Sequence, residues 1–297
     1  MRTSVEQATA VSGAASVTLR SLFDGPPRPA RALGVGPAAV FVRADGKGQV
    51  GAAEQAGLGI LTLCTHDAVR LPLAIVVAAS AADPPWAGRV SAGDSVTVGD
   101  DLVRLPGLTI CIVRWWAPAR PRPVDDEGLD LTIPLLRSLL RERAVDLPAG
   151  IGANLRCLRR ALATGEQARA RRAVDAMLGL GPGLTPAGDD VIAGLLLAVH
   201  HLGEPREPAI AALRAYVLTA APRRTTAVSA ALLAHAAEGH GAPQVIAVLS
   251  ALGTGRGLRA ALSALLRVGH TSGGDLAHGV AAGAQLVLRQ RAPRGAA

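Results

Sequence analysis

Residues 117–123, with the sequence APARPRP, divide the chain into two parts with different hydrophobic periods. Closely spaced prolines can neither continue a strand nor begin a regular helix. Short runs rich in Val, Ile, Leu and Thr precede this segment, and Ala- and Leu-rich helical patterns follow it. We therefore expect a β-rich domain at residues 1–122 and an all-α domain at residues 123–297.

The N-terminal part is expected to form a small β-sandwich or barrel-like domain, which makes the fold class α+β. Its predicted strands are residues 16–22, 38–43, 59–65, 73–78, 95–98 and 108–116. Gly/Pro/Asp turn signals such as residues 24–27 and 83–85 separate them. Short strands at this spacing are typical of a compact sandwich or barrel.

The C-terminal part is expected to be a bundled or orthogonal set of helices. The predicted helices are residues 134–144, 151–164, 167–178, 189–202, 208–220, 225–238, 243–252, 258–268 and 275–289. The longest apolar run, residues 191–199, is too short for a bilayer, which needs about 20 residues. We therefore expect no membrane partner.

The formal charge of +8 is a weak indicator of nucleic-acid binding in this chain. The basic residues are almost all arginines spread along the sequence, and aromatic side chains for base stacking are scarce. We therefore expect no nucleic-acid partner. Three widely spaced cysteines and an N-terminus without a signal-peptide pattern favour a cytoplasmic location.

The C-terminal part carries the pattern G-x-T-x-x-G-D twice, each time before an apolar helical stretch. The first copy is Gly183, Thr185, Gly188 and Asp189. The second copy is Gly269, Thr271, Gly274 and Asp275. A glycine loop, a hydroxyl and backbone N–H groups at a helix start are suited to binding a small anion. Two copies predict two helix starts that face one cavity.

In the first copy, Thr185 is expected to cap a helix that has Pro186 at its first position. Asp189 and Asp190 then fall in the first turn, where adjacent side chains diverge by about 100°. We expect Asp189 to face the ligand, because Asp275 is its counterpart, and Asp190 to assist. A merely capped helix start explains a single copy about as well.

In the second copy, His270, Thr271 and Ser272 lie close to Asp275 in the sequence. A histidine in such a loop serves as an acid or base, or donates a hydrogen bond to an anion. The alternative is a histidine that only satisfies a loop carbonyl.

Between the two copies, a third segment combines an arginine with hydroxyl groups at a predicted helix start. It contains Arg224, Thr225, Thr226 and Ser229. Arginine, hydroxyls and backbone N–H groups together suit a carboxylate or phosphate. A capped helix with a solvated arginine is the alternative.

These motifs define the candidate site. The candidate catalytic residues are Asp189, Asp275 and His270. The candidate substrate-binding residues are Gly183, Thr185, Gly188, Asp190, Arg224, Thr225, Thr226, Ser229, Thr271, Ser272 and Gly274. If a cofactor is required, Asp189, Asp190 and Asp275 suit Mg²⁺ or Mn²⁺, which prefer oxygen ligands.

The motif blocks GLGPGLTPAGDDVIAGLLLA, RRTTAVSAALLAHAAEG and VGHTSGGDLAHGVAAG together resemble the AllH-like family, formerly described as a domain of unknown function. That family includes the AllH-type subunit of oxamate carbamoyltransferase. The resemblance implies carbamoyl transfer between oxalurate and phosphate in allantoin catabolism. It also implies two further subunits, one of them similar to the α-chain of succinyl-CoA synthetase.

Three functions remain open from the sequence. The first is a carbamoyltransferase subunit that binds a small anionic substrate at the two helix starts. The second is a self-sufficient hydrolase or lyase that uses Mg²⁺ or Mn²⁺. The third is a non-catalytic scaffold subunit whose β domain docks a partner.

Overall fold

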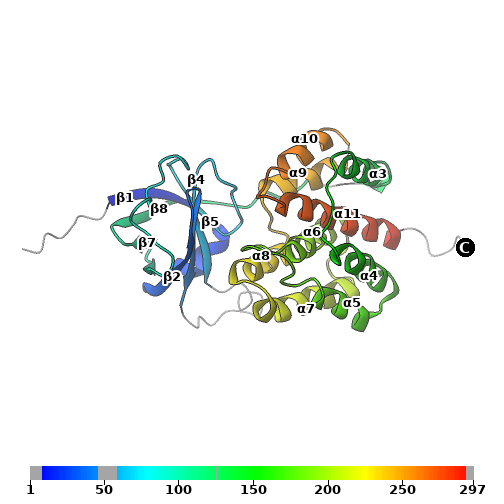
Figure 1. The fold of residues 1–297 in the computed structure, drawn as a ribbon, viewed down its shortest axis with the longest axis horizontal. Helices are drawn as coiled ribbons and strands as arrows, with labels where there is room; N and C mark the ends of the chain where they lie inside the picture. Colours follow the sequence, from blue (N-terminus) through cyan, green and yellow to red (C-terminus); the bar gives the residue numbers. More distant parts are fainter. Residues whose placement is uncertain (1–8, 46–58, 123, 125, 254, 292–297) are drawn as a thin grey trace, which may run out of the picture. The chain divides into compact units, whose positions relative to one another are not determined.

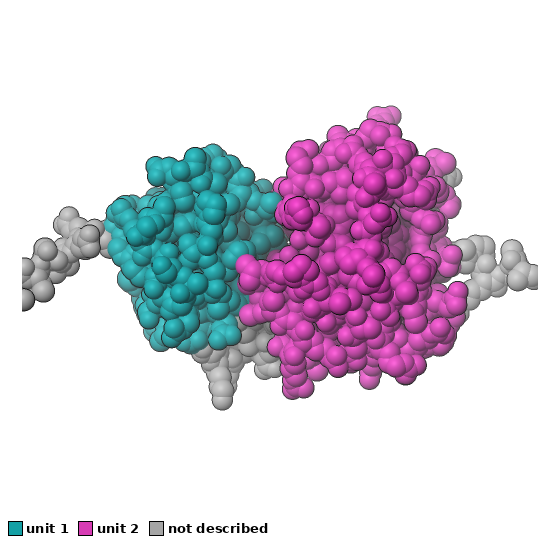
Figure 2. Space-filling view, in the orientation of Figure 1, with its two compact units in different colours: residues 1–51, 58–118 teal, residues 52–57, 119–297 magenta. Residues whose placement is uncertain are grey.

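The computed structural model describes residues 9–45, 59–122, 124, 126–253 and 255–291. The chain divides into two compact units, one of residues 1–51 and 58–118, the other of residues 52–57 and 119–297 (Figure 2). The first unit contains the described strands, and the second contains the helices α3 to α11 (Figure 1). None of the helices in the described ranges is long and apolar enough to span a membrane.

The strands of the first unit form one closed barrel, so the expected sandwich was wrong, whereas the expected barrel character and helical part agree with the structure. The order around the barrel is β1-β5-β4-β3-β2-β6-β7-β8. The strands are β1 (Thr9–Ser16), β2 (Arg28–Val35), β3 (Ala39–Ala44), β4 (Ile60–Thr65), β5 (Ala74–Val77), β6 (Ser95–Gly99), β7 (Leu102–Leu105) and β8 (Leu108–Trp116). The pairs β1–β8 and β4–β5 are parallel and the others antiparallel.

Strand β1, which the sequence pattern did not predict, closes the barrel. It pairs with β5 on one side and with β8 on the other, so neither of those strands is left as an edge. A Cβ on Gly13 would lie 2.8 Å from Ile110 Cγ2 and 2.9 Å from Ile75 Cγ2. A residue without a side chain at this position therefore lets the large interior residues fill the barrel.

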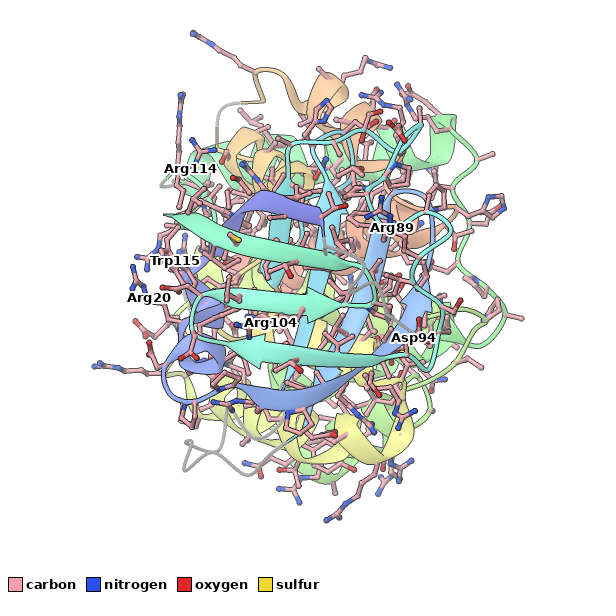
Figure 3. The ribbon with its side chains drawn as sticks, turned by 90° about the vertical axis from the view of Figure 1, so that its left-hand side faces the viewer. Arg20, Arg89, Asp94, Arg104, Arg114 and Trp115 are labelled. Atoms are coloured by element: carbon pink, nitrogen blue, oxygen red, sulfur yellow. The ribbon has the colours of Figure 1, made fainter. Side chains whose placement is uncertain are left out.

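Residues 16–22 were expected to be a strand, but only Ser16 belongs to one, at the end of β1. The residues after it leave the barrel as the short helices η1 (Val17–Leu19) and α1 (Arg20–Phe23). The Ser16 side chain caps this turn by accepting a hydrogen bond from Thr18 N–H. The Arg20 guanidinium lies 4.7 Å from the centre of the Trp115 ring (Figure 3). Phe23 meets the same ring edge to face. These contacts hold the turn against β8.

The second unit is built around α6 (Ala187–Leu202), which is buried on every face. Helix α6 packs against α8 (Ala227–Ala237) and along α11 (Ser272–Arg291) (Figure 1). The other helices are α3 (Asp126–Glu142), α4 (Ile151–Thr164), α5 (Gln167–Asp175), α7 (Pro208–Arg224), α9 (Pro243–Ala251) and α10 (Leu258–Leu265).

Glycines let α6 and α11 approach at backbone distance. A Cβ on Gly194 would lie 2.2 Å from Leu276 O, and one on Gly279 would lie 2.1 Å from Val191 O. Because α6 and α11 each follow one copy of the repeated motif, this packing brings the two helix starts together.

Candidate functional site

The carboxylate of Asp189 is enclosed by hydrogen bonds from its own unit. Its Oδ1 accepts from Gly179 N–H at 2.8 Å, and its Oδ2 accepts from Ser229 Oγ at 2.7 Å and from Thr225 Oγ1. Asp189 is 1% exposed, and burial raises its pKa while these hydrogen bonds act in the opposite direction. Asp189 thus ties the first motif to the start of α8.

The segment around Thr226 completes this connection. Thr226 caps α8 by accepting a hydrogen bond from Ser229 N–H at 3.0 Å, and its hydroxyl donates to Leu184 O in the first motif. Arg224 forms an ion pair with Asp175, with Nε and Oδ1 3.3 Å apart. The hydroxyls and the arginine of the third segment therefore have protein partners.

Thr185 does not cap α6, contrary to the expectation from its sequence. Pro186 occupies the N-cap position, and no side chain caps the helix there. The Thr185 hydroxyl lies instead 3.1 Å from Ser272 Oγ at the start of α11. This hydrogen bond joins the two copies of the motif.

Asp190 faces the junction between the two copies. Burial raises its pKa to about 7, the negative charges of Asp275 and Asp189 add to this, and hydrogen bonds with Ser272 and Thr185 oppose it. Burial likewise raises the pKa of Asp275 to about 6, against a hydrogen bond with Thr271. Within the described part of the chain, the Oδ2 atoms of Asp190 and Asp275 are buried and have no hydrogen-bond partner.

A cleft of about 580 Å³ opens beside Asp275. The second motif contributes His270, Thr271, Gly274 and Asp275 to its wall, and residues 143–146 with Pro148 form the other side. Val145 approaches closely, since a Cβ on Gly274 would lie 2.7 Å from Val145 Cγ1. His278 Nε2, 2.7 Å from Val145 O, fixes the same segment. We call this space the motif cleft.

Arg143 and Asp146 in the motif cleft were not predicted from the sequence. They follow α3, more than 120 residues before the second motif, and nothing in their spacing links them to it. Ala144 between them has φ of 48°, in the left-handed region that disfavours a residue with a Cβ. The strained residue lies at the wall of the cleft, which is where such conformations tend to occur.

Neither Gly183 nor Gly188 of the first motif lines the motif cleft. A Cβ on Gly188 would lie 2.0 Å from Met177 O, so this glycine lets the first turn of α6 pack against the chain after α5. Gly183 has φ of 90° and open space around it. The first motif therefore contributes to packing and to the Thr185–Ser272 junction, and the second motif lines the cleft.

The family described as Oxamate carbamoyltransferase subunit AllH matches residues 177–284. That stretch is an AllH domain. The match confirms the resemblance of the three motif blocks, all of which lie within the AllH domain. It indicates a subunit associated with a carbamoyltransferase, and such an enzyme contains other subunits. No solved structure matches this chain.

The AllH domain contains α6, the part of α11 up to residue 284 and both motif copies, whereas the Arg143 side of the motif cleft precedes it. In the described part of the chain, the carboxylates of Asp189, Asp190 and Asp275 are not among the groups of three side chains close enough to hold one metal ion.

Proposed function

We propose that this chain is a carbamoyltransferase subunit that holds a small carbamoyl-bearing anion in the motif cleft. The observation that carries the proposal is the unpartnered Oδ2 of Asp275, buried in the wall of an open cleft that the AllH motif lines. A buried carboxylate oxygen without a partner needs a donor, and a carbamoyl group supplies N–H donors.

The other groups of the motif cleft match the rest of such a ligand. The Arg143 guanidinium suits the carboxylate of oxamate or oxalurate, or a phosphate. The Thr271 hydroxyl and the N-terminus of α11 add donors for the same negative charge. In this proposal Asp275 therefore orients the carbamoyl nitrogen, and Arg143 neutralises the anion.

For carbamoyl transfer from oxalurate, the bond between the carbamoyl carbon and the bridging nitrogen breaks, and a bond to a phosphate oxygen forms. The phosphate loses a proton, and the leaving nitrogen gains one to give oxamate. His270 lines the motif cleft and is an imidazole suited to moving that proton. We assign His270 this role as part of the proposal.

We further propose that the other subunits include one similar to succinyl-CoA synthetase and a second chain. The barrel lies outside the AllH domain, and in this proposal it is the part of the chain that docks these subunits. We propose that residues 1–122 and residues 123–297 are the two functional domains of the chain.

Calorimetry with the purified full chain tests the site. Oxamate, oxalurate, carbamoyl phosphate and inorganic phosphate are titrated into the wild type, Asp275→Asn and Arg143→Gln. Loss of a charge-assisted hydrogen bond of about 1.5–3 kcal/mol weakens binding by roughly 10- to 100-fold. Asp130→Asn and Arg137→Gln make the same chemical changes on exposed positions of α3 and are expected to leave binding unchanged.

Binding of these ligands with equal affinity in wild type and Asp275→Asn would overturn the placement of the site. Binding of none of them would overturn the substrate class. With the other subunits present, formation of carbamoyl phosphate from oxalurate and phosphate measures the activity. A parallel titration with Mg²⁺ and Mn²⁺ tests the self-sufficient metal-dependent enzyme.

A further inference from the structure

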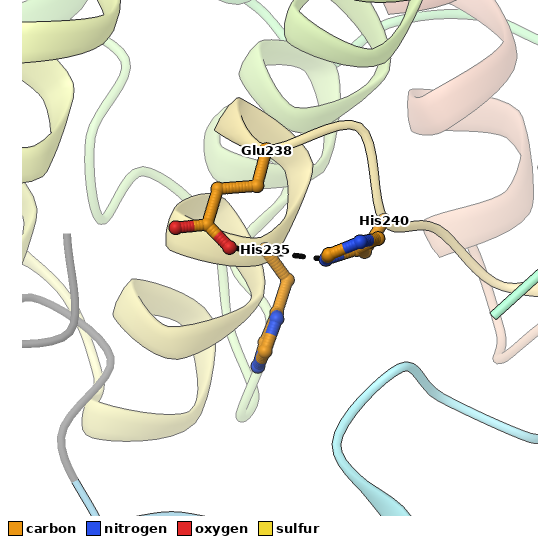
Figure 4. A group of neighbouring side chains, drawn as sticks. All are labelled: His235, Glu238 and His240. Carbon is orange, nitrogen blue, oxygen red and sulfur yellow. Dashed lines mark ion pairs between the residues drawn. The ribbon is translucent and has the colours of Figure 1, made fainter. Parts of the chain in front are cut away.

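The end of α8 carries two histidines and a glutamate outside the proposed substrate site. They are His235 in the last turn, Glu238 at the C-cap and His240 two residues later (Figure 4). One nitrogen or carboxylate oxygen from each residue lies within 4.8 Å of the others. In the described part of the chain this is the one group of three such side chains close enough to hold a metal ion.

The backbone explains why these side chains meet. Gly239 has φ of 82°, His240 N–H donates to His235 O at 2.8 Å, and Gly239 N–H donates to Ala236 O at 3.0 Å. These two bonds form a Schellman motif, in which the side chains three positions before and two after the helix cap come together, usually as a hydrophobic contact. Here both positions are histidines, with ring centres 6.1 Å apart.

The imidazole nitrogens are available as ligands. Nδ1 of His235 and Nδ1 of His240 are buried without a hydrogen-bond partner among the described residues. Glu238 Oε2 lies 3.8 Å from His240 Nδ1, too far for a hydrogen bond. Burial lowers the pKa of His235, with a smaller contribution from His240 in the same direction.

We propose that His235, Glu238 and His240 bind a divalent transition cation, with Zn²⁺ as the best fit. Two imidazoles and one carboxylate are a known ligand set for Zn²⁺ and leave a fourth position for water. Ligand atoms around tetrahedral Zn²⁺ lie roughly 3.3 Å apart, so small side-chain rotations close the site. Such a mixed nitrogen and oxygen set is less suited to Mg²⁺.

Positively charged residues around the site make Glu238 the most important of the three proposed metal ligands. The positive charge of Arg120 acts on His240, and that of Arg214 acts on the neighbouring His200 ring. These charges disfavour a cation, so the negative charge of Glu238 is required to offset them. The His200 ring lies against Gly239, since a Cβ there would be 2.4 Å from His200 Cδ2.

The proposed metal site shares no residue with the motif cleft. Helix α8 has 11 residues, or about 16 Å, and its other end carries the Thr225 and Ser229 bonds to Asp189. In this proposal, a cation at the C-terminus of α8 stabilises the turn that follows the helix. Its effect on substrate affinity is expected to be small.

The test uses the full chain without a polyhistidine tag, freed of metal with a chelator. Competition with a chromophoric chelator measures Zn²⁺ affinity for the wild type, Glu238→Gln, His240→Ala and the control His66→Ala. His66 is an exposed histidine in the barrel unit, where its Nδ1 lies 2.8 Å from Ala79 O, and it belongs neither to the metal group nor to the motif cleft. We expect one Zn²⁺ per wild-type chain and for His66→Ala, with binding at least 10-fold weaker in the other two variants.

Two further measurements do not depend on how well a variant folds. X-ray absorption of the Zn²⁺-loaded wild type is expected to show two imidazole ligands and oxygen donors, and Zn²⁺ is expected to raise its melting temperature. Absence of saturable binding by Zn²⁺, Co²⁺ and Ni²⁺ would overturn the proposal. An unchanged affinity for Zn²⁺ in Glu238→Gln would also overturn it, because Glu238 is exposed and its replacement is not expected to unfold the protein.

Discussion

The hydroxyl oxygens of Thr185 and Ser272 lie 3.1 Å apart and share a hydrogen bond, although 87 positions separate the two residues in the chain. This bond joins the loop before α6 to the first residue of α11. It places Asp190 and Asp275, one from each copy of the motif, close enough for their charges to interact. The paired motifs thus form one buried polar junction.

A double-mutant cycle measures the Thr185–Ser272 bond. Thr185→Val and Ser272→Ala each remove one hydroxyl, and we expect a coupling free energy of about 0.5–1.5 kcal/mol in urea unfolding. Strictly additive effects of the two substitutions would show that the hydroxyls do not interact.

Asp189→Asn is expected to lower the free energy of unfolding of the helical unit. The substitution removes no contact with the proposed ligand, because Asp189 does not line the motif cleft. The amide replaces one carboxylate oxygen with an N–H₂ group, which faces a backbone N–H or the hydroxyls of Thr225 and Ser229. One buried donor left unsatisfied costs about 1–3 kcal/mol. Urea unfolding measures this loss, and Asp130→Asn on the exposed side of α3 is the matched control. Equal stability of the two variants would contradict the assignment.

Gly194→Ala is expected to force α6 and α11 apart, because the new Cβ would lie 2.2 Å from Leu276 O. Overpacking of this kind typically costs about 1–3 kcal/mol. Gly152→Ala in α4 is the control, since its Cβ would meet Arg156 Nη1 at 3.5 Å, an ordinary contact with a flexible side chain. We expect the control to be neutral or stabilised by up to about 1 kcal/mol. Thermal unfolding of both variants distinguishes the two effects.

The buried pair Asp190 and Asp275 is expected to make the protein less stable as the pH rises. Burial raises the pKa of Asp190 to about 7 and that of Asp275 to about 6, above the unfolded value near 3.9. Between about pH 4 and these values the folded state therefore binds more protons than the unfolded state. The free energy of unfolding then falls by up to about 1.4 kcal/mol per pH unit for each group, and this contribution levels off above about pH 7.

Asp190→Asn tests this directly, because an amide imitates the neutral carboxyl group. We expect the variant to gain stability relative to wild type between pH 5 and pH 7.5, and Asp130→Asn to show no such change. Urea unfolding at the two pH values provides the comparison. A difference between Asp190→Asn and wild type that is constant with pH would show that Asp190 is ionised throughout.

The sequence by itself determined the elements whose ends are encoded locally. Helix α4 occupies residues 151–164 as predicted, because the left-handed Gly165 ends it. Helix α9 begins at Pro243 as predicted, since proline suits the first helical position. Strand β8 also has its predicted bounds, with a β-branched and apolar sequence that favours a strand. The repeated motif likewise marked two helix starts, and its residues identified the AllH domain.

The tertiary structure decided the features that depend on partners far along the chain. Strand β1 has the sequence TAVSGAAS, whose low strand propensity is offset by hydrogen bonds with β5 and β8. Asp189 and Asp190 are equivalent by local pattern, yet the first accepts hydrogen bonds from Gly179, Thr225 and Ser229, and the second faces α11. Arg143 reaches the motif cleft only because α3 ends beside the second motif. Local sequence sets where a helix begins, whereas burial and long-range hydrogen bonds determine which of its side chains remains available for a ligand.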